Sequence, residues 1–329
     1  MIAAGFAESL SLLASNGALQ GCLGPEVEFS LVGAALIGLA VGFLSGLLGV
    51  GGGFLLAPLV NGLLQVPFRV TGPSNLCQIQ GTSLSGLLRH RRQGNVDVKV
   101  ALIVLVGTLC GTFAGVNIME HLKTLGSVTL AGGQYTTVEV VLSFLFLAML
   151  AVIGGTVLVE AVATGRRLTR TEDPKEATRR GLFAGVRIPP YVTPIGGEPV
   201  PMLLVAGAGV VVGMLQSLLG ISGVLLLPVL VYFVGVSTHA AVGTNLMVVF
   251  ATSLLGTTLH ALAGNISLPL VFMLLAGGTL GSQFGALLSP RIAGHKLRKY
   301  FALLVVAAMV MVAGKLAYMY GLISWWPGR

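Results

Sequence analysis

Charged residues are scarce in this chain. Only 9% of its 329 residues are Asp, Glu, Lys or Arg, whereas about 25% is usual for a soluble domain. A soluble fold of this length would expose more surface than so few charges could solvate. The deficit excludes an ordinary soluble protein. The 55% hydrophobic content and the mean hydropathy of +0.93 indicate a protein with many membrane spans.

Cysteines and catalytic signatures are also few. Cys22, Cys77 and Cys110 are far apart in the sequence and form no metal-ligand or redox spacing. The chain has no HExxH, no CxxC and no Ser/His/Asp order with supporting motifs. The glycine-rich segment 49–53 lacks the Lys and Ser/Thr pair of a phosphate loop. We therefore expect no enzymatic activity, no cofactor and no metal.

The formal net charge of +8 does not indicate a nucleic-acid partner. The basic residues lie in short joints between apolar runs, where an excess of Lys and Arg marks the cytoplasmic side of a membrane protein. Segments 89–99, 160–199 and 290–299 hold most of them. We predict that these three segments are cytoplasmic and that both termini are not.

Ten apolar runs divide the chain. They lie near 30–48, 54–66, 73–89, 98–119, 138–159, 200–219, 223–236, 240–262, 267–289 and 299–320. Most approach the length of a spanning helix, but 54–66 and 223–236 are short, and whether these two span the membrane or re-enter it stays open. The predicted organisation is a lead-in (1–29), a first membrane repeat (30–159), a cytoplasmic linker (160–199), a second repeat (200–322) and a tail (323–329).

The two halves of the membrane portion are related in sequence. Residues of 73–96 recur 170 positions later, and upstream of them a single gap aligns 47–49 with 218–220. The recurring residues are Asn75, Leu76, Thr82, Ser83, Leu84, Gly86, His90, Gly94 and Asn95, followed by Gly107, Gly111 and Gly115. Composition alone would not align this many polar residues and glycines. Because 89–99 is basic and its counterpart 259–269 has no Lys or Arg, the repeats are predicted to be inverted. The expected fold is all-α, with two inverted repeats of about five helical segments each, including short broken or re-entrant helices.

Each short apolar run follows a glycine-rich break. The breaks contain Gly51, Gly52 and Gly53 in the first half and Gly220, Ser222 and Gly223 in the second. A break near the middle of the membrane frees backbone N–H groups at a helix start, which together can bind an anion. The alternative is that these glycines only allow a tight hairpin or a close helix crossing.

Polar residues form one stripe at helical spacing in each half. Asn75 and Thr82 lie on one face of the third run, and Asn245 and Thr252 repeat that face in the eighth. Such residues either line a site for a solute or hydrogen-bond neighbouring helices. The candidate site residues on these helices are Asn75, Gln78, Thr82, Ser83, Asn245, Thr252 and Ser253.

Histidines and carboxylates lie toward the ends of the runs, and Lys315 lies inside a late one. His90 and His260 end their helices, where they either relay protons or cap the helix. Asp97 and Glu139 lie at run edges, and we find no carboxylate near the middle of any span. Lys315 is expected to extend its amine to the outer interface.

These motifs together resemble the TauE/SafE family. The resemblance rests on Leu47–Phe54 with Pro58, on Gly81-Thr82-Ser83, and on the basic turn His90–Asp97; the second half answers with Leu219–Gly223, Pro228, His239–Asn245 and Gly264-Asn265-Ile266. It covers about 30–122 and 200–320. It implies export of a small sulfur-containing anion, such as sulfite or an organosulfonate, by a carrier of the bacterial inner membrane. Thr71–Asn75 departs from the Ala-Val-Gly-Thr pattern that the second half keeps.

The predicted function is that of a secondary transporter for a small anion, working by alternating access. The expected partners are the anionic substrate and the lipid bilayer, without nucleic acid, and a homodimer stays open. Three alternatives remain at this point: an importer of a sulfur compound, an anion channel, and an accessory subunit of a membrane enzyme.

Overall fold

The protein is a helical bundle. The computed structural model describes residues 29–48, 53–130, 133–167, 181–186, 188–195, 197–221, 223–288 and 294–322. The helices of the first half are α3 (Leu31–Leu48), α4 (Gly53–Leu64), α5 (Phe68–Arg92), α6 (Val98–Thr124) and α7 (Thr137–Arg167). Those of the second half are α8 (Met202–Leu219), α9 (Leu226–Pro228) with the π-helical turn η2 (Val229–Val234), α10 (Thr238–Leu262), α11 (Leu268–Leu288) and α12 (Gly294–Met319).

The helices fit a membrane, because a helix satisfies its own backbone hydrogen bonds where water is absent. Five described segments are long and apolar enough to cross a bilayer: Val98–Thr124, Thr137–Gly155, Met202–Leu219, Ala240–Leu262 and Leu268–Gly285. With 12 residues, α4 is too short to span alone. The predicted helical membrane class is confirmed.

Two small antiparallel hairpins interrupt the helical pattern that we predicted. β1 (Ser127–Leu130) pairs with β2 (Gly133–Thr136), and β3 (Tyr191–Val192) pairs with β4 (Val200–Pro201). A single 3-10 turn, η1 (Leu182–Gly185), precedes β3. These connecting segments lie outside the helices and satisfy part of their backbone by strand pairing. In addition, α7 continues to Arg167, past the expected end of the first repeat at 159.

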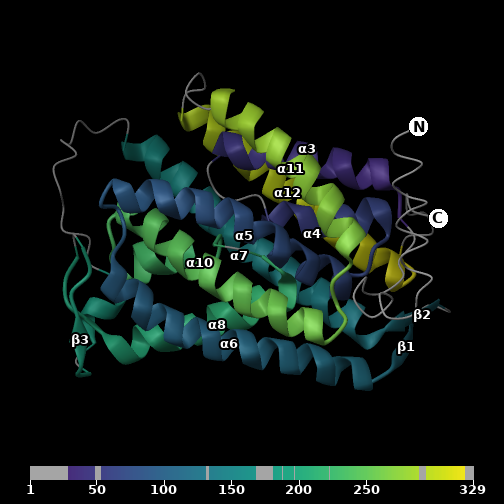
Figure 1. The fold of residues 1–329 in the computed structure, drawn as a ribbon, viewed down its shortest axis with the longest axis horizontal. Coiled ribbons are helices and arrows are strands. Elements are labelled where there is room, and N and C mark those ends of the chain that lie inside the picture. The colour runs from purple at the N-terminus through teal and green to yellow at the C-terminus, as the bar shows by residue number, and fades with distance from the viewer. Residues whose placement is uncertain are drawn as a thin grey trace.

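The helices pack in pairs that join the two halves of the chain. α5 packs against α10 near the middle of the bundle, with α6 and α8 along one side and α3 and α11 along another (Figure 1). α7 packs against α12. In the repeat, α8 is the counterpart of α3, and α11 is the counterpart of α6. Exchanging each helix for its counterpart therefore turns the pair α3–α11 into α8–α6. The pairs α5–α10 and α7–α12 are unchanged by the exchange.

Glycines form the seams of the two matching pairs. A Cβ atom at Gly38 of α3 would lie 2.8 Å from the Leu274 carbonyl oxygen of α11. A Cβ atom at Gly209 of α8 would lie 2.7 Å from the Val104 carbonyl oxygen of α6. Val104 and Leu274 are 170 residues apart, and the two glycines are 171 apart, as the sequence alignment with its one gap requires. The duplication seen in the sequence therefore extends to individual helix contacts, which small residues make possible.

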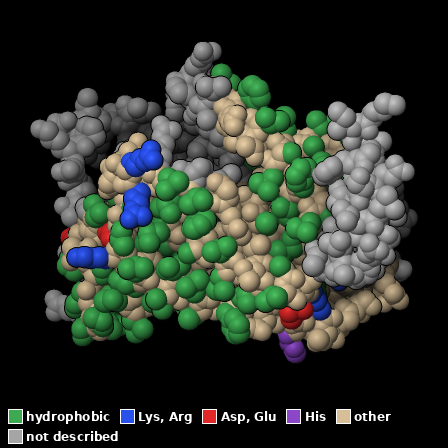
Figure 2. All heavy atoms as spheres, in the orientation of Figure 1, with side chains coloured by type: hydrophobic (Ala, Val, Ile, Leu, Met, Phe, Trp, Pro, Cys, Tyr) green, Lys and Arg blue, Asp and Glu red, His purple; other side chains and the backbone are tan. Residues whose placement is uncertain are grey.

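The surface has the polarity of a membrane protein. On the face drawn in Figure 2, hydrophobic side chains cover the middle, while the charged side chains gather toward its two ends.

At the start of α6, the Asp97 carboxylate accepts a hydrogen bond from the Val100 amide at 3.1 Å. This acid caps a helix at a span edge, as the sequence placed it.

Candidate functional site

The second break has a backbone conformation that glycine permits. α8 ends at Leu219, and Gly220 follows in the left-handed region at φ 64°. A side chain on Gly220 would also overlap the backbone of Gly72 in α5. Glycine is required here both by the conformation and by the close approach of α5. The chain resumes as α9 at Leu226.

Asn75 joins the two breaks. Its side chain is fully buried, and its Nδ2 atom donates to the Gly53 carbonyl oxygen at 2.6 Å and to the Gly220 carbonyl oxygen at 2.6 Å. Gly53 begins α4 and Gly220 follows the last residue of α8, so residues from both halves meet at one amide group. Sequence reasoning named all three residues for the site, and the structure brings them together.

The other candidate residues of the second half also lie beside its break. Asn245 is buried, and a Cβ atom added at Gly223 would lie 2.6 Å from its Nδ2 atom. The hydroxyl of Thr252 accepts a hydrogen bond from Nε2 of Gln216 at 3.1 Å, and Gln216 lies in the last turn of α8. Asn245 and Thr252 thus face Gly223 and Gln216, respectively.

The remaining candidates are placed differently. The Ser83 and Ser253 hydroxyls donate to carbonyl oxygens of their own helices, at 2.8 Å to Ile79 and 3.0 Å to Phe250, so neither hydroxyl hydrogen faces the breaks. Gln78 is buried, and its Nε2 atom lies beside Gly278 of α11. Thr82 belongs to α5, but its side chain lies outside what the structure describes, as do residues Gly51, Gly52 and Ser222.

The two histidines occupy equivalent helix ends. The amide of Asn95 donates to the His90 carbonyl oxygen at 3.0 Å, and the amide of Asn265 donates to the His260 carbonyl oxygen at 2.9 Å. Gly94 and Gly264 have positive φ in both places, which completes the same C-terminal cap. The repeated His-Gly-Asn spacing therefore has a structural role in each half.

His260 also belongs to a polar network. Its ring is fully buried, and Nε2 lies 3.2 Å from the Ser217 carbonyl oxygen, which can only accept. The Nδ1 atom then accepts from Nδ2 of Asn265 at 3.2 Å, so both ring nitrogens are engaged with the ring neutral. Asn265 in turn contacts Glu120 at 2.8 Å and Lys123 of α6. This network reaches from the side of α6 to the last turn of α8. The role of His90 or His260 as a proton relay stays a prediction.

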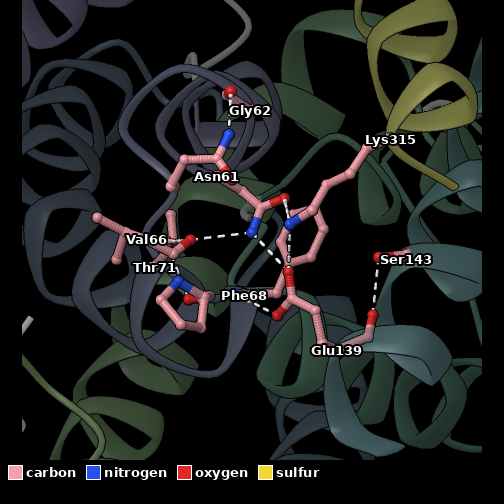
Figure 3. Close-up of polar contacts among 10 residues, drawn as sticks. Asn61, Gly62, Val66, Phe68, Thr71, Glu139, Ser143 and Lys315 are labelled. Carbon is pink, nitrogen blue, oxygen red and sulfur yellow. Dashed lines mark hydrogen bonds and ion pairs between the residues drawn. The ribbon is translucent and has the colours of Figure 1, made fainter. Parts of the chain in front are cut away.

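Sequence reasoning missed one buried polar cluster, shown in Figure 3. The Glu139 carboxylate of α7 accepts from Lys315 of α12 at 2.5 Å, from Asn61 of α4 at 2.7 Å, and from the Phe68 amide at 2.9 Å. Lys315 donates in addition to Asn61 at 2.7 Å. The expectation that Lys315 extends to the interface is wrong: its amine turns inward, because a buried carboxylate offers it a partner.

The cluster ties down the α4–α5 connection. Asn61 lies in the last turn of α4, and its Nδ2 atom also donates to the Val66 carbonyl oxygen at 2.9 Å. Phe68 is the first residue of α5. Glu139 therefore bonds both sides of the connection between α4, which begins at Gly53, and α5, which carries Asn75. One sequence signal was available. Glu139 and Lys315 are charges of opposite sign in two apolar runs, and such charges can form an ion pair when the two runs are adjacent.

The atoms that meet at the breaks are uncharged amides and carbonyls. In the described parts of the chain, no group of three or more His, Cys, Asp or Glu side chains could hold a metal ion. Two interrupted helices that meet between the related halves of an apolar bundle are the architecture of membrane transport proteins.

The comparison with known proteins identifies the family within this class. The chain belongs to the TauE/SafE family, because the family model described as "Sulfite exporter TauE/SafE" matches residues 34–312. YunE of Bacillus subtilis (strain 168), described as "Probable membrane transporter protein YunE", is 23% identical over 88% of this chain and 98% of its own length. A "Probable membrane transporter protein" of Xylella fastidiosa (strain Temecula1 / ATCC 700964) is 26% identical over 83% of this chain and 90% of its own. No solved structure matches the chain. The resemblance read from the sequence is confirmed, and the protein is a membrane transporter.

Proposed function

We propose that the protein is a secondary carrier that moves a small anion, with sulfite or an organosulfonate as the substrate class, out of the bacterial cell. The observation that carries this proposal is the Asn75 side chain, which binds Gly53 of one break and Gly220 of the other. A group that contacts both halves at once is suited to alternating access, in which one half moves against the other about a fixed site. The description of the family supports the choice of anion.

The inverted relation of the repeats is part of this proposal. The matching glycine seams and the correspondence of α3–α11 with α8–α6 support a twofold relation between the halves, and the charge of the joints supports their inversion. Five segments in each half, together with a basic joint in only one half, reverse the second repeat across the membrane.

Counterflow in proteoliposomes tests the proposal. Vesicles loaded with unlabelled sulfite are expected to accumulate external [35S]sulfite transiently, because a carrier exchanges substrate across the membrane. A channel gives equilibration without overshoot, and an accessory subunit gives no flux. Either result would overturn the carrier proposal.

The site is tested by removing one amide at a time. Asn75→Ala and Asn245→Ala are each expected to weaken apparent sulfite affinity about tenfold. The Asn75 side chain holds the Gly53 and Gly220 carbonyls together and Asn245 lies beside Gly223, and a lost hydrogen bond at a buried site is worth about 1 kcal/mol or more. Affinity is measured as the concentration dependence of counterflow, with the folded fraction checked by size-exclusion chromatography. Asn117→Ala is the matched control, because Asn117 is exposed and bonds only the Phe113 carbonyl oxygen of its own helix. Unchanged affinity in both variants would place the site elsewhere.

The topology is tested at equivalent positions of the two halves. In a background without native cysteines, Gln93→Cys and Ala263→Cys are expected to react with a membrane-impermeant maleimide from opposite sides. These positions are chosen because they avoid the neighbouring left-handed glycines, Gly94 and Gly264. The Gln93→Cys variant should react only after the inner face is exposed, and the Ala263→Cys variant in intact cells. Reaction of both from one side contradicts the inverted repeat.

A further inference from the structure

Three residues near the second break carry a buried amide oxygen without a hydrogen-bond partner among the described residues. The Asn75 side chain is fully buried and that of Gln216 is 2% exposed, yet Oδ1 of the first and Oε1 of the second have no hydrogen-bond partner among the described residues. The Oδ1 atom of Asn245, beside Gly223, is in the same condition. A buried acceptor without a partner is costly, and such groups commonly mark a place where something binds.

The orientation of the Asn75 amide is fixed by its surroundings. Its Nδ2 atom faces two backbone carbonyl oxygens, those of Gly53 and Gly220. If the amide were turned over, Oδ1 would face both of these oxygens, and no hydrogen would lie between them. The Oδ1 atom therefore stays directed away from the two carbonyls as an acceptor.

The orientation of Gln216 is fixed by the same reasoning. The Thr252 hydroxyl donates its single hydrogen to the Val248 carbonyl oxygen at 2.8 Å, so toward Gln216 it can only accept. The group facing Thr252 must then be Nε2, which leaves Oε1 as an acceptor. Two amides from different helices thus present oxygen in directions that other bonds determine.

Gln216 lies at the negative end of α8, and Asn75 lies between that end and the start of α4. Gln216 is in the last turn of α8, the Gly220 amide caps its carbonyl at 2.8 Å, and Asn75 binds the Gly220 carbonyl oxygen. The C-terminal end of a helix carries a partial negative charge. An anion would be repelled there, whereas the start of α4 at Gly53 is the end that attracts one.

We propose that the amide oxygens of Asn75 and Gln216, at the C-terminal end of α8, bind a monovalent cation that is carried together with the anion. The ligands are neutral oxygens without a carboxylate, which suits a singly charged ion better than Mg²⁺ or Ca²⁺. The cation offsets the charge of the anion beside the neutral amides and carbonyls of the described residues. This pairing rests on the proposed anion-carrier function, whereas binding of the cation itself does not.

Sodium is the probe for the test. The purified protein is titrated with NaCl against choline chloride at constant total chloride, without added anion, and thermal unfolding is followed by intrinsic fluorescence. A saturable rise in Tm with Na⁺ is expected, because a ligand that binds the folded state stabilises it. Gln216→Met is expected to raise the half-saturating Na⁺ concentration at least tenfold. The matched control is Gln283→Met, the same substitution at an exposed position on α11, which should leave it unchanged.

Transport separates this inference from the carrier proposal. Sulfite counterflow is expected to fall at least tenfold when Na⁺ is replaced by choline on both sides. Undiminished counterflow in choline, or a Tm that does not respond to Na⁺, would overturn the cation site and leave the carrier standing. Stabilisation only by anions that bear a hydroxyl or amino group would also overturn it, since the oxygens would then receive a hydrogen of the substrate. Na⁺-dependent stabilisation without counterflow in any salt would instead retain the cation site and refute the carrier.

Discussion

Glu139→Gln is expected to lower the free energy of unfolding by about 3–5 kcal/mol, because it leaves the amine of Lys315 buried without its carboxylate. The side chains of this pair are 11% and 13% exposed, so water replaces little of the lost interaction. The carboxylate also binds Asn61 and the Phe68 amide, so the same change weakens the contacts that hold the α4–α5 connection. Unfolding of the purified protein in detergent, followed by fluorescence, measures the effect.

A double-mutant cycle identifies the cause of this loss. Lys315→Met alone should be similarly destabilising, whereas Glu139→Gln with Lys315→Met should recover most of the stability, because no uncompensated charge remains. The pair Glu120–Lys123 gives the comparison: its side chains are 40% and 23% exposed, and Glu120→Gln should cost about 1 kcal/mol or less. Costs that simply add in the double variant would contradict a coupled pair at this position.

Gly213→Val is expected to abolish folding or to cost about 3 kcal/mol or more, because overpacking in a tight seam forces backbones apart. A Cβ atom at Gly213 of α8 would overlap the Thr108 carbonyl oxygen of α6. The bundle would have to separate α6 from α8 along much of their shared seam. Fluorescence-detected size-exclusion chromatography of membrane extracts measures the folded fraction, which should fall at least tenfold.

Gly207→Val is the matched control for this prediction. Gly207 lies on the same helix, but an added Cβ atom there would meet nothing within 4 Å. The substitution is expected to leave the folded fraction within about twofold, since valine costs no more than glycine in a helix interior. If both variants fold equally well, α6 and α8 do not pack as closely as the structure places them.

Several residues that meet near the breaks could be named from the sequence, for local reasons, and their role in binding stays a prediction. The breaks were visible because glycine clusters interrupt apolar runs, and Asn75 was visible because it stands in a polar stripe that recurs at Asn245. The sequence did not reveal that Asn75 reaches both breaks, since Gly220 lies 145 positions away along the chain. The sequence also did not show which partner the Ser83 hydroxyl has. In a helix the carbonyl four residues earlier competes with a solute for that hydrogen, and here the Ile79 carbonyl oxygen receives it.

By itself, the sequence determined the membrane class, the duplication and the position of the interruptions, because hydropathy, repeat spacing and glycine clusters are properties of short stretches of chain. Only the tertiary structure decided which groups meet. Glu139 and Lys315 are 176 residues apart, and their pairing depends on α7 packing against α12. The orientation of the Asn75 and Gln216 amides likewise depends on the crossing of α5, α8 and α10, since a side-chain amide can turn either face outward until its partners are in place.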